Sequence, residues 1–274
     1  MRQYNSELGE AVRLVQSGAL KQALVQIEKN NAGTDKDILY FFEMGKLFSL
    51  GSNYSASRDT WLKGDEIIPA LENDIRNNSS RLSGDIVSYL ISDKTCRYEG
   101  QDYEKVLFST RLTLDHIMLS NFEHARIEMK KTYEREKPIK AFREKYEALK
   151  AEAEKQETGQ ITRLDGYPME EIDTAKVREL KNGFQNAFAH YLAGYFFEVT
   201  DEPSLAEPGY RNALQLAPGK AIIQSALDSV GKARPDLGAV DVLFVIETGF
   251  APSIDSLNIP IPRRNGIFVT PLTK

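Results

Sequence analysis

The chain of 274 residues contains one cysteine and three histidines. Because Cys96 stands alone, the chain can form neither an internal disulfide nor a metal cluster built from cysteines. We interpret it as a small, partly buried side chain. The histidines, His116, His124 and His190, form no H-x-x-x-H or H-E-x-x-H pair, so they predict packing or turn residues and no metal site.

Features typical of membrane and nucleic-acid-binding proteins are also missing. The sequence has no run of about 18 apolar residues, so we expect no transmembrane segment. A net charge of -5 and a pI near 5.5 argue against nucleic acid as a partner, since that binding requires a basic face. The first ten residues, MRQYNSELGE, lack the apolar core of a signal peptide. Both a cytoplasmic protein and one that follows a removed leader remain open.

The common catalytic and nucleotide-binding motifs are absent as well. The sequence has no G-x-x-x-x-G-K-[ST] or G-x-G-x-x-G loop to hold phosphates, and no G-x-S-x-G elbow to present a nucleophile. Its acidic residues lie in charge-patterned helical stretches, which indicates solvent-exposed faces. We therefore predict no catalytic residues and no cofactor.

What the chain does contain is one stretch that occurs twice, 149 positions apart. The segment from Ile38 to Pro69 matches the segment from His190 to Pro218 at small, aromatic and proline positions. The matched pairs are Gly45 and Gly194, Phe48 and Phe197, Ser57 and Ala206, Trp61 and Tyr210, Gly64 and Ala213, and Pro69 and Pro218. This order resembles a tetratricopeptide repeat, in which two antiparallel helices approach each other at small residues.

The repeat pattern predicts a role for each kind of matched residue. Glycine in a helix interior costs about 1 kcal/mol relative to alanine, so Gly45 and Gly194 require a packing reason. Trp61 and Tyr210 are expected to fill the space between the two helices of their hairpin. The prolines at positions 69 and 218 are expected to end the second helix.

The same register extends to other parts of the chain. Ala23 lies 34 residues before Ser57, which predicts a first unit over residues 6–30, and Ala125 lies 68 residues after Ser57, which predicts another over 102–136. Residues 70–101 have the length of one repeat but match it poorly. We interpret them as a degenerate helix pair with a loop near 92–101.

The remaining segments differ in composition from the repeats. A charged helical arm is predicted over about 126–158, kinked or broken at Pro138, and a solvated arm is favoured over a coiled coil because apolar heptads are not sustained. A linker is expected over about 160–181 and a closing helix over 221–233. The β-branched run 240–249 predicts a strand that pairs with 256–271 or lies in the repeat groove.

The fold prediction is a mainly α protein, an α-α superhelix of tetratricopeptide-like helical hairpins with a short C-terminal extended or β segment. The helical repeat domain is expected to cover residues 5–232, and the strand or extended segment residues 233–274.

Residues 98–131, 186–218 and 242–262 together resemble a family of bacterial envelope lipoproteins with tetratricopeptide-type repeats. The resemblance implies a periplasmic location, an outer-membrane lipid anchor on the native N-terminus, no assigned catalytic residues, and a protein or peptide partner such as another envelope lipoprotein. Pro203, where the repeat has an aromatic residue, and Glu10, at an apolar position, depart from the pattern.

Repeat geometry places the first helix of each unit on the concave side, where aromatic residues with polar neighbours are typical of a peptide groove. Burial against the arm or the C-terminal segment is the alternative for these side chains. The predicted groove residues are Leu39, Phe42, Lys46, Ser49, Tyr191, Tyr195 and Glu198.

Two functions remain open on this basis. The first is a non-catalytic protein-binding scaffold of the bacterial cell envelope. The second is an envelope hydrolase or cell-wall enzyme whose active site has no recognisable motif. A cytoplasmic location is the alternative to the periplasm, and the sequence indicates no oligomeric state.

Overall fold

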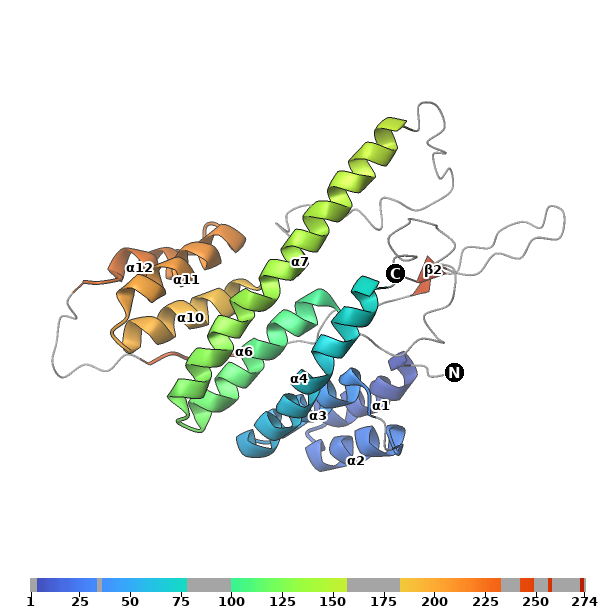
Figure 1. The fold of residues 1–274 in the computed structure, drawn as a ribbon. Coiled ribbons are helices and arrows are strands. Elements are labelled where there is room, and N and C mark those ends of the chain that lie inside the picture. The colour runs from blue at the N-terminus through green and yellow to red at the C-terminus, as the bar shows by residue number, and fades with distance from the viewer. Residues whose placement is uncertain are drawn as a thin grey trace. The chain divides into compact units, whose positions relative to one another are not determined.

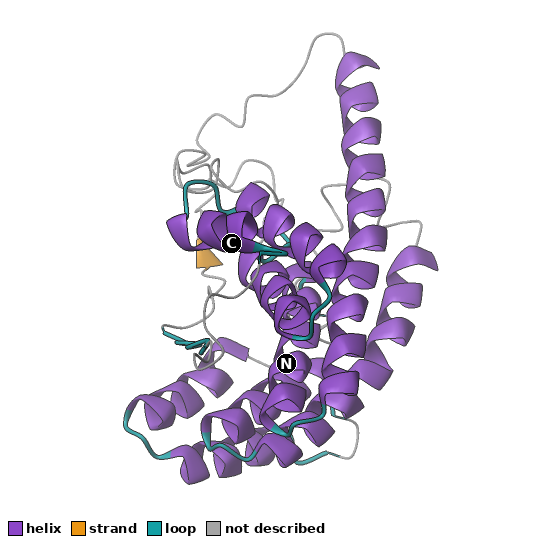
Figure 2. Cartoon of the chain, turned by 90° about the vertical axis from the view of Figure 1, so that its left-hand side faces the viewer, coloured by secondary structure: helices purple, strands orange, loops and turns teal. Residues whose placement is uncertain are grey.

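The computed structural model describes residues 4–33, 36–77, 100–156, 183–232, 242–248, 256–257 and 272–273. The chain divides into two compact units, residues 1–185 and 186–274. Helices make up most of the described residues in both units (Figures 1 and 2). The predicted domain boundaries, 5–232 and 233–274, stay predictions.

The first unit is a row of helical hairpins. Its helices are α1 (Tyr4–Gln16), α2 (Leu20–Asn30), α3 (Ile38–Leu50), α4 (Tyr54–Asn77), α6 (Asp102–Met118) and α7 (Phe122–Gln156). Within the hairpins α1 packs on α2, α3 on α4 and α6 on α7, and between them α2 packs on α3 and α4 on α6 (Figure 1). Each hairpin therefore covers the apolar side of the next, as in a repeat protein.

The second unit contains one further hairpin and a closing helix. The hairpin consists of α10 (Ala187–Val199) and α11 (Pro203–Leu216), and α12 (Ala221–Ser229) packs on α11. Since α12 begins 34 residues after α10, it occupies the place of the first helix of a following repeat. The closing helix predicted there is confirmed.

The turn inside each hairpin has the same backbone geometry. One residue in the turn has a positive φ, and the next residue donates its N–H to the carbonyl five positions earlier, for example Asn53 to Phe48 at 2.9 Å. This is the Schellman arrangement that ends a helix. The positive-φ residues are Gly18, Ser52, Ser120 and Asp201, with φ of 77°, 59°, 58° and 60°. Their spacings of 34, 68 and 81 residues reproduce the register read from the sequence.

The contact between α3 and α4 explains the repeated spacing inside the hairpin. A Cβ on Gly45 would lie 2.6 Å from Cε2 of Trp61, so only glycine lets the indole ring lie against α3. Ser57 donates its hydroxyl to the Gly45 carbonyl at 2.8 Å and accepts the indole N–H of Trp61 at 3.0 Å. The ring is thus both packed and hydrogen-bonded, as a buried tryptophan requires.

The hairpin of the second unit repeats this arrangement. A Cβ on Gly194 would lie 2.7 Å from Cδ1 of Tyr210, and the phenol of Tyr210 donates to Glu198 at 2.6 Å. A Cβ on Gly209 would lie 2.7 Å from the backbone N of Gly194, which shows how closely α10 and α11 approach. The roles predicted for Gly45, Gly194, Trp61 and Tyr210 are confirmed.

Helix α6 packs directly on the α3–α4 hairpin. The ring of Phe108 lies 5.1 Å from that of Trp61 in a T-shaped contact and 5.7 Å from that of Phe42. These rings belong to a core cluster with Ile38, Ile68 and Leu112. A second cluster joins α1, α2 and α3 through Ala11, Ala23, Ile27, Met44 and Leu47. The degenerate helix pair predicted over 70–101 lies mostly outside the described residues.

Two proline predictions had different outcomes. Helix α11 ends at Leu216, two residues before Pro218, as predicted. Helix α4 continues through Pro69 to Asn77, so the prediction that Pro69 ends the helix is wrong. Pro69 is exposed, and the carbonyl that it leaves without a helical N–H donor can be hydrated there.

The charged arm is formed by α7, which runs unbroken through Pro138. Its first half is part of the unit, with Ala125, Glu128, Met129, Thr132 and Glu136 buried at helical spacing. The described side chains further along, at positions 141, 144 and 148, are exposed, in agreement with a solvated arm. The predicted linker over about 160–181 lies outside the described residues.

The C-terminal region contains a short antiparallel pair. Strands β1 (Ser256–Leu257) and β2 (Leu272–Thr273) pair with Ser256 opposite Thr273. Residues 242–248 are in no strand, so the strand predicted over 240–249 is wrong for this described part. A β-branched sequence favours a strand but cannot supply the neighbour that its backbone needs. The overall prediction, a mainly α fold of tetratricopeptide-like hairpins with a short extended or β segment, is confirmed.

Candidate functional site

The four groove residues predicted on α3 have different environments. Phe42 is buried in the core, with its ring centroid 5.9 Å from that of Trp61. It cannot act as an exposed anchor in this structure. Leu39 is also buried, whereas Lys46 and Ser49 are half-buried and can contact a partner.

The three groove residues predicted on α10 are all half-buried. The ring of Tyr191 lies 5.4 Å from that of Tyr210, and Glu198 accepts the Tyr210 hydroxyl. Burial raises the pKa of Tyr191, with Glu198 and Tyr195 adding to the effect. These residues belong to the second unit and the α3 residues to the first. One groove formed by both sets stays a prediction.

Lys46 belongs to a partly buried group of charges with Arg111 and Asp115 of α6. Burial lowers the pKa of Lys46 to about 8, an effect that Arg111 strengthens and Asp115 opposes. Burial raises the pKa of Asp115 to about 6, while the neighbouring Ser57 hydroxyl and the nearby cations oppose the change. The group offers charges of both signs beside the half-buried part of α3.

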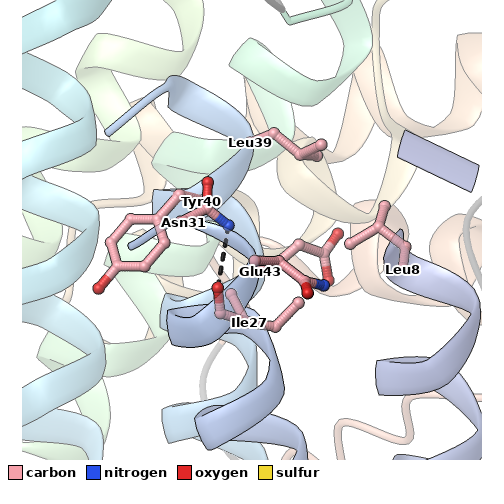
Figure 3. A pocket seen from close by; sticks show the side chains of 7 residues that line it. Leu8, Ile27, Asn31, Leu39, Tyr40 and Glu43 are labelled. Atoms are coloured by element: carbon pink, nitrogen blue, oxygen red, sulfur yellow. Dashed lines mark hydrogen bonds between the residues drawn. The ribbon is translucent and has the colours of Figure 1, made fainter. Parts of the chain in front are cut away.

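A shallow hollow that is partly open to solvent lies where α1, α2 and α3 meet. Figure 3 shows its lining side chains converging from the three helices. We call it the α1–α3 hollow, and its lining residues are Leu8, Ile27, Asn30, Asn31, Leu39, Tyr40 and Glu43. Of these, the sequence analysis identified only Leu39 as a binding residue.

Glu43 is the one acidic residue in the lining of the α1–α3 hollow. Its carboxylate makes no hydrogen bond and no ion pair with any residue that the structure describes. Burial raises its pKa to about 7, and the negative charge of Glu104 on α6 adds to this effect. A signal for this site was present in the sequence, because Glu43 interrupts the apolar start of α3, ILYFFEMG.

The polar residues beside the hollow are already paired with one another. Lys36 donates to Glu28 at 2.7 Å, and the Tyr40 hydroxyl donates to the same carboxylate at 2.6 Å. Lys36 also lies 4.4 Å from the centroid of the Tyr40 ring. The hydrogen bonds from Lys36 and Tyr40 lower the pKa of Glu28. This group joins α2 to α3.

Two histidines stack near the turn between α6 and α7. The rings of His116 and His124 have centroids 5.2 Å apart, and His116 is buried. Burial lowers the pKa of His116 to about 4, helped by His124, Arg58 and Lys131. Its imidazole is therefore neutral at pH 7 and packs between helices. Within the described ranges no three His, Cys, Asp or Glu residues are grouped as metal ligands.

None of the helices in the described part of the chain is both long enough and apolar enough to cross a membrane.

Comparison with known proteins gives fold neighbours only. No family model and no curated protein matches the sequence. The chain is similar to a chain of the APC/C hetero-tetramer Cut9–Hcn1 (TM-score 0.46, 9% identity, 82% of this chain and 29% of that one). It is also similar to the TPR2AB domain of yeast Sti1 in complex with pHSP90, with a TM-score of 0.33 and 13% identity over 82% of this chain and 69% of that one. A third similar structure is a tetratricopeptide repeat protein from Parabacteroides merdae, with a TM-score of 0.22 and 14% identity over 82% of this chain and 83% of that one. These TM-scores are below 0.5, so the likenesses carry no argument about function.

Proposed function

We propose that this chain is a non-catalytic scaffold that binds a protein or peptide partner along the first helices of its repeats. One observation carries the proposal. The last residue of the first helix is an exposed apolar side chain in three hairpins: Leu50 on α3, Met118 on α6 and Val199 on α10, exposed by 42%, 56% and 41%. Single exposed apolar residues are common, but this one recurs at the same repeat position.

Predicted groove residues earlier on α3 and α10 extend this surface. Lys46 and Ser49 lie beside Leu50, and Tyr191 and Tyr195 precede Val199 on the same helix. All four are half-buried and combine polar groups with aromatic rings, the composition of a peptide-binding surface. In each unit, the proposed binding surface keeps the groove residues of that unit and adds its exposed apolar positions. Its concave location is part of the proposal.

The location proposed is the bacterial cell envelope, with a lipid anchor on the native N-terminus and another envelope lipoprotein as a candidate partner. Its support is the family resemblance of residues 98–131, 186–218 and 242–262. Fractionation of the producing cells, with mass spectrometry of the native N-terminus, tests it. Recovery of the native protein in the cytoplasmic fraction without a lipid would contradict it. No feature of the described residues favours the hydrolase alternative.

The binding proposal is tested with two double variants of the first unit. Leu50→Gln with Met118→Gln changes the repeated position on α3 and α6. Leu62→Gln with Ile127→Gln is the control, since these side chains are exposed by 37% and 49% but lie on the second helices α4 and α7.

Each protein is immobilised and exposed to envelope extract, and the retained proteins are quantified. The first double variant is expected to retain at least about thirtyfold less partner, because each of the two anchors contributes about 1 kcal/mol or more. The control is expected to retain as much as the parent. Equal retention by both double variants would contradict the proposal, as would turnover of a substrate by the purified chain.

A further inference from the structure

The α6–α7 hairpin carries a titratable ring at a position where the other described hairpins have an apolar side chain. In each hairpin the third-last residue of the first helix has the carbonyl that accepts the N–H closing the turn. In chain order these residues are Leu14, Phe48, His116 and Phe197. Their spacings of 34, 68 and 81 residues are those of the repeat. Among these four positions, the histidine is specific to the α6–α7 hairpin.

The ring of His116 is covered by a second imidazole. His124, in the first turn of α7, stacks on it with the ring centroids 5.2 Å apart and the planes inclined by 22°. His116 is only 4% exposed, and its Nδ1 has no hydrogen-bond partner among the described residues. His124 is exposed, so it lies on the solvent side of the stack. The two rings thus join the end of α6 to the start of α7.

The groups that act on His116 from the neighbouring helices are basic. They come from both helices that pack on α6, and they are His124 and Lys131 of α7 and Arg58 of α4. Burial is the main cause of the lowered pKa of His116, and these groups add to it. The carbonyl end of α6 favours a positive charge, but burial outweighs this effect. The carboxylate of Asp115, the preceding residue, lies near cations of α3, α4 and α6.

The carboxylates of α4 and α7 in this region form ion pairs with the same cations. Asp59 pairs with Arg58 at 2.7 Å. Asp65 and Glu128 pair with Lys131 at 3.3 and 2.8 Å. A proton on the buried histidine would therefore add a dehydrated positive charge beside cations whose own partners are already engaged.

We propose that the α6–α7 turn is an acid-sensitive joint, closed at neutral pH by the stacked rings of His116 and His124 and opened when His116 takes up a proton. The proton makes both ring nitrogens donors in a place that is dry and surrounded by basic groups. Turning the charged ring out to water releases the stack. It also loosens the turn, in which Asn121 donates its N–H to the His116 carbonyl at 2.8 Å.

The joint lies next to one residue of the proposed binding surface. Met118, which is 56% exposed, follows His116 by two residues at the end of α6. Opening of the joint is expected to displace this side chain and to weaken capture of a partner in acid. This consequence rests on the proposed function, whereas the joint itself does not.

The test is amide hydrogen exchange of the full chain, followed by NMR at pH 7 and at pH 4.5. Protection factors are compared, because they remove the pH dependence of the exchange chemistry and report opening of the structure. The Asn121 amide reports the α6–α7 turn. The Asn53 amide is the matched control, since it donates the same hydrogen bond in the α3–α4 turn, to Phe48 at 2.9 Å.

The protection of Asn121 is expected to fall at least about tenfold from pH 7 to pH 4.5. The reason is that the open state binds the His116 proton with the ordinary pKa of 6.5, whereas the closed state binds it with a pKa of about 4. The protection of Asn53 is expected to change much less.

Two variants assign the proton. His116→Phe introduces the residue that α3 and α10 have at this position, so it is expected to fold and to abolish the fall at Asn121. His124→Phe keeps both the stack and the buried histidine, so the fall is expected to persist. The two amides of the parent also decide the question without any variant.

Equal falls at Asn121 and Asn53 would overturn the inference, because they would report acid loosening of the whole unit. A fall that survives in His116→Phe would overturn it too. Its loss in His124→Phe would assign the proton to the other ring and have the same effect. No partner is present in these measurements, so capture through Leu50 and Met118 can still succeed when the joint fails.

Discussion

Gly45 and Gly9 both lie inside helices, but their surroundings differ. A Cβ on Gly45 would meet the Trp61 ring at 2.6 Å, whereas nothing lies within 4 Å of a Cβ on Gly9. Gly45→Ala is expected to destabilise the chain by about 1–3 kcal/mol, because the ring must move out of its packed position. Gly9→Ala is expected to stabilise it by up to about 1 kcal/mol, since alanine is the better helix former. Urea unfolding of both variants measures the difference, and effects of the same sign would contradict the hairpin geometry.

Glu43 makes stability depend on pH in a defined direction. Its folded-state pKa of about 7 is above the ordinary value of 4.5, so the folded protein binds this proton more tightly than the unfolded chain does. The folded state is therefore favoured at low pH, and this advantage is lost as the pH rises from about 4.5 to 7. We expect the unfolding free energy of the parent to fall by about 1–3 kcal/mol relative to Glu43→Gln over this range.

This prediction is checked by urea unfolding of the parent and of Glu43→Gln at several pH values between 4 and 8. The comparison isolates Glu43, because the raised pKa of Asp115 acts in both proteins. A constant difference between the two proteins across this range would show that Glu43 is not dehydrated in the folded state.

At the scale of elements, the turn between two helices requires a left-handed backbone in each hairpin. Gly18 adopts this conformation at no steric cost, whereas Ser52, Ser120 and Asp201 do so despite a side chain. Gly18→Ala is expected to destabilise the first hairpin by about 1 kcal/mol, and Ser120→Gly to leave stability unchanged or raise it slightly. Thermal unfolding followed by circular dichroism compares them. A neutral Gly18→Ala would mean that the first turn lacks the geometry of the others.

The sequence allowed the hairpins to be predicted because their determinants are local. Gly45 and Trp61 lie 16 positions apart in one hairpin, and the spacing alone indicates that they meet. The end of α4 could not be predicted, because the effect of Pro69 depends on whether its neighbouring carbonyl reaches water. The prediction of a strand over 240–249 was wrong for a related reason. Pairing is non-local, and the β-branched run does not specify a partner strand.

The binding residues were harder to predict than the fold. Repeat geometry identified Leu39 and Phe42 by their position on the first helix, but burial there depends on the next hairpin. Phe108 of α6 covers Phe42, and a template position does not show this. Glu43 was missed because a single acidic residue in an apolar stretch gives no motif. The environment of Glu43 can be described only from the folded structure, where α1, α2 and α3 surround it.

At the scale of the whole molecule, stacking of hairpins joins distant segments into one unit. Helix α6 packs on α4, although its register lies two periods after that of α3. A repeat protein tolerates this because each hairpin needs only a neighbour that covers its apolar side. The first helices α3, α6 and α10 also share an exposed apolar residue at their last position, and the proposed function is based on this repeated position.

The central claim, that a partner binds along the first helices, is tested most directly by photo-crosslinking. A benzoylphenylalanine residue is placed singly at positions 50, 118, 62 and 127 of the full chain, which is irradiated in envelope extract. Positions 50 and 118, at the ends of α3 and α6, are predicted to cross-link to the same protein, while positions 62 and 127 on α4 and α7 give little or no cross-link to it. Equal cross-linking from all four positions, or none from positions 50 and 118, would contradict the account.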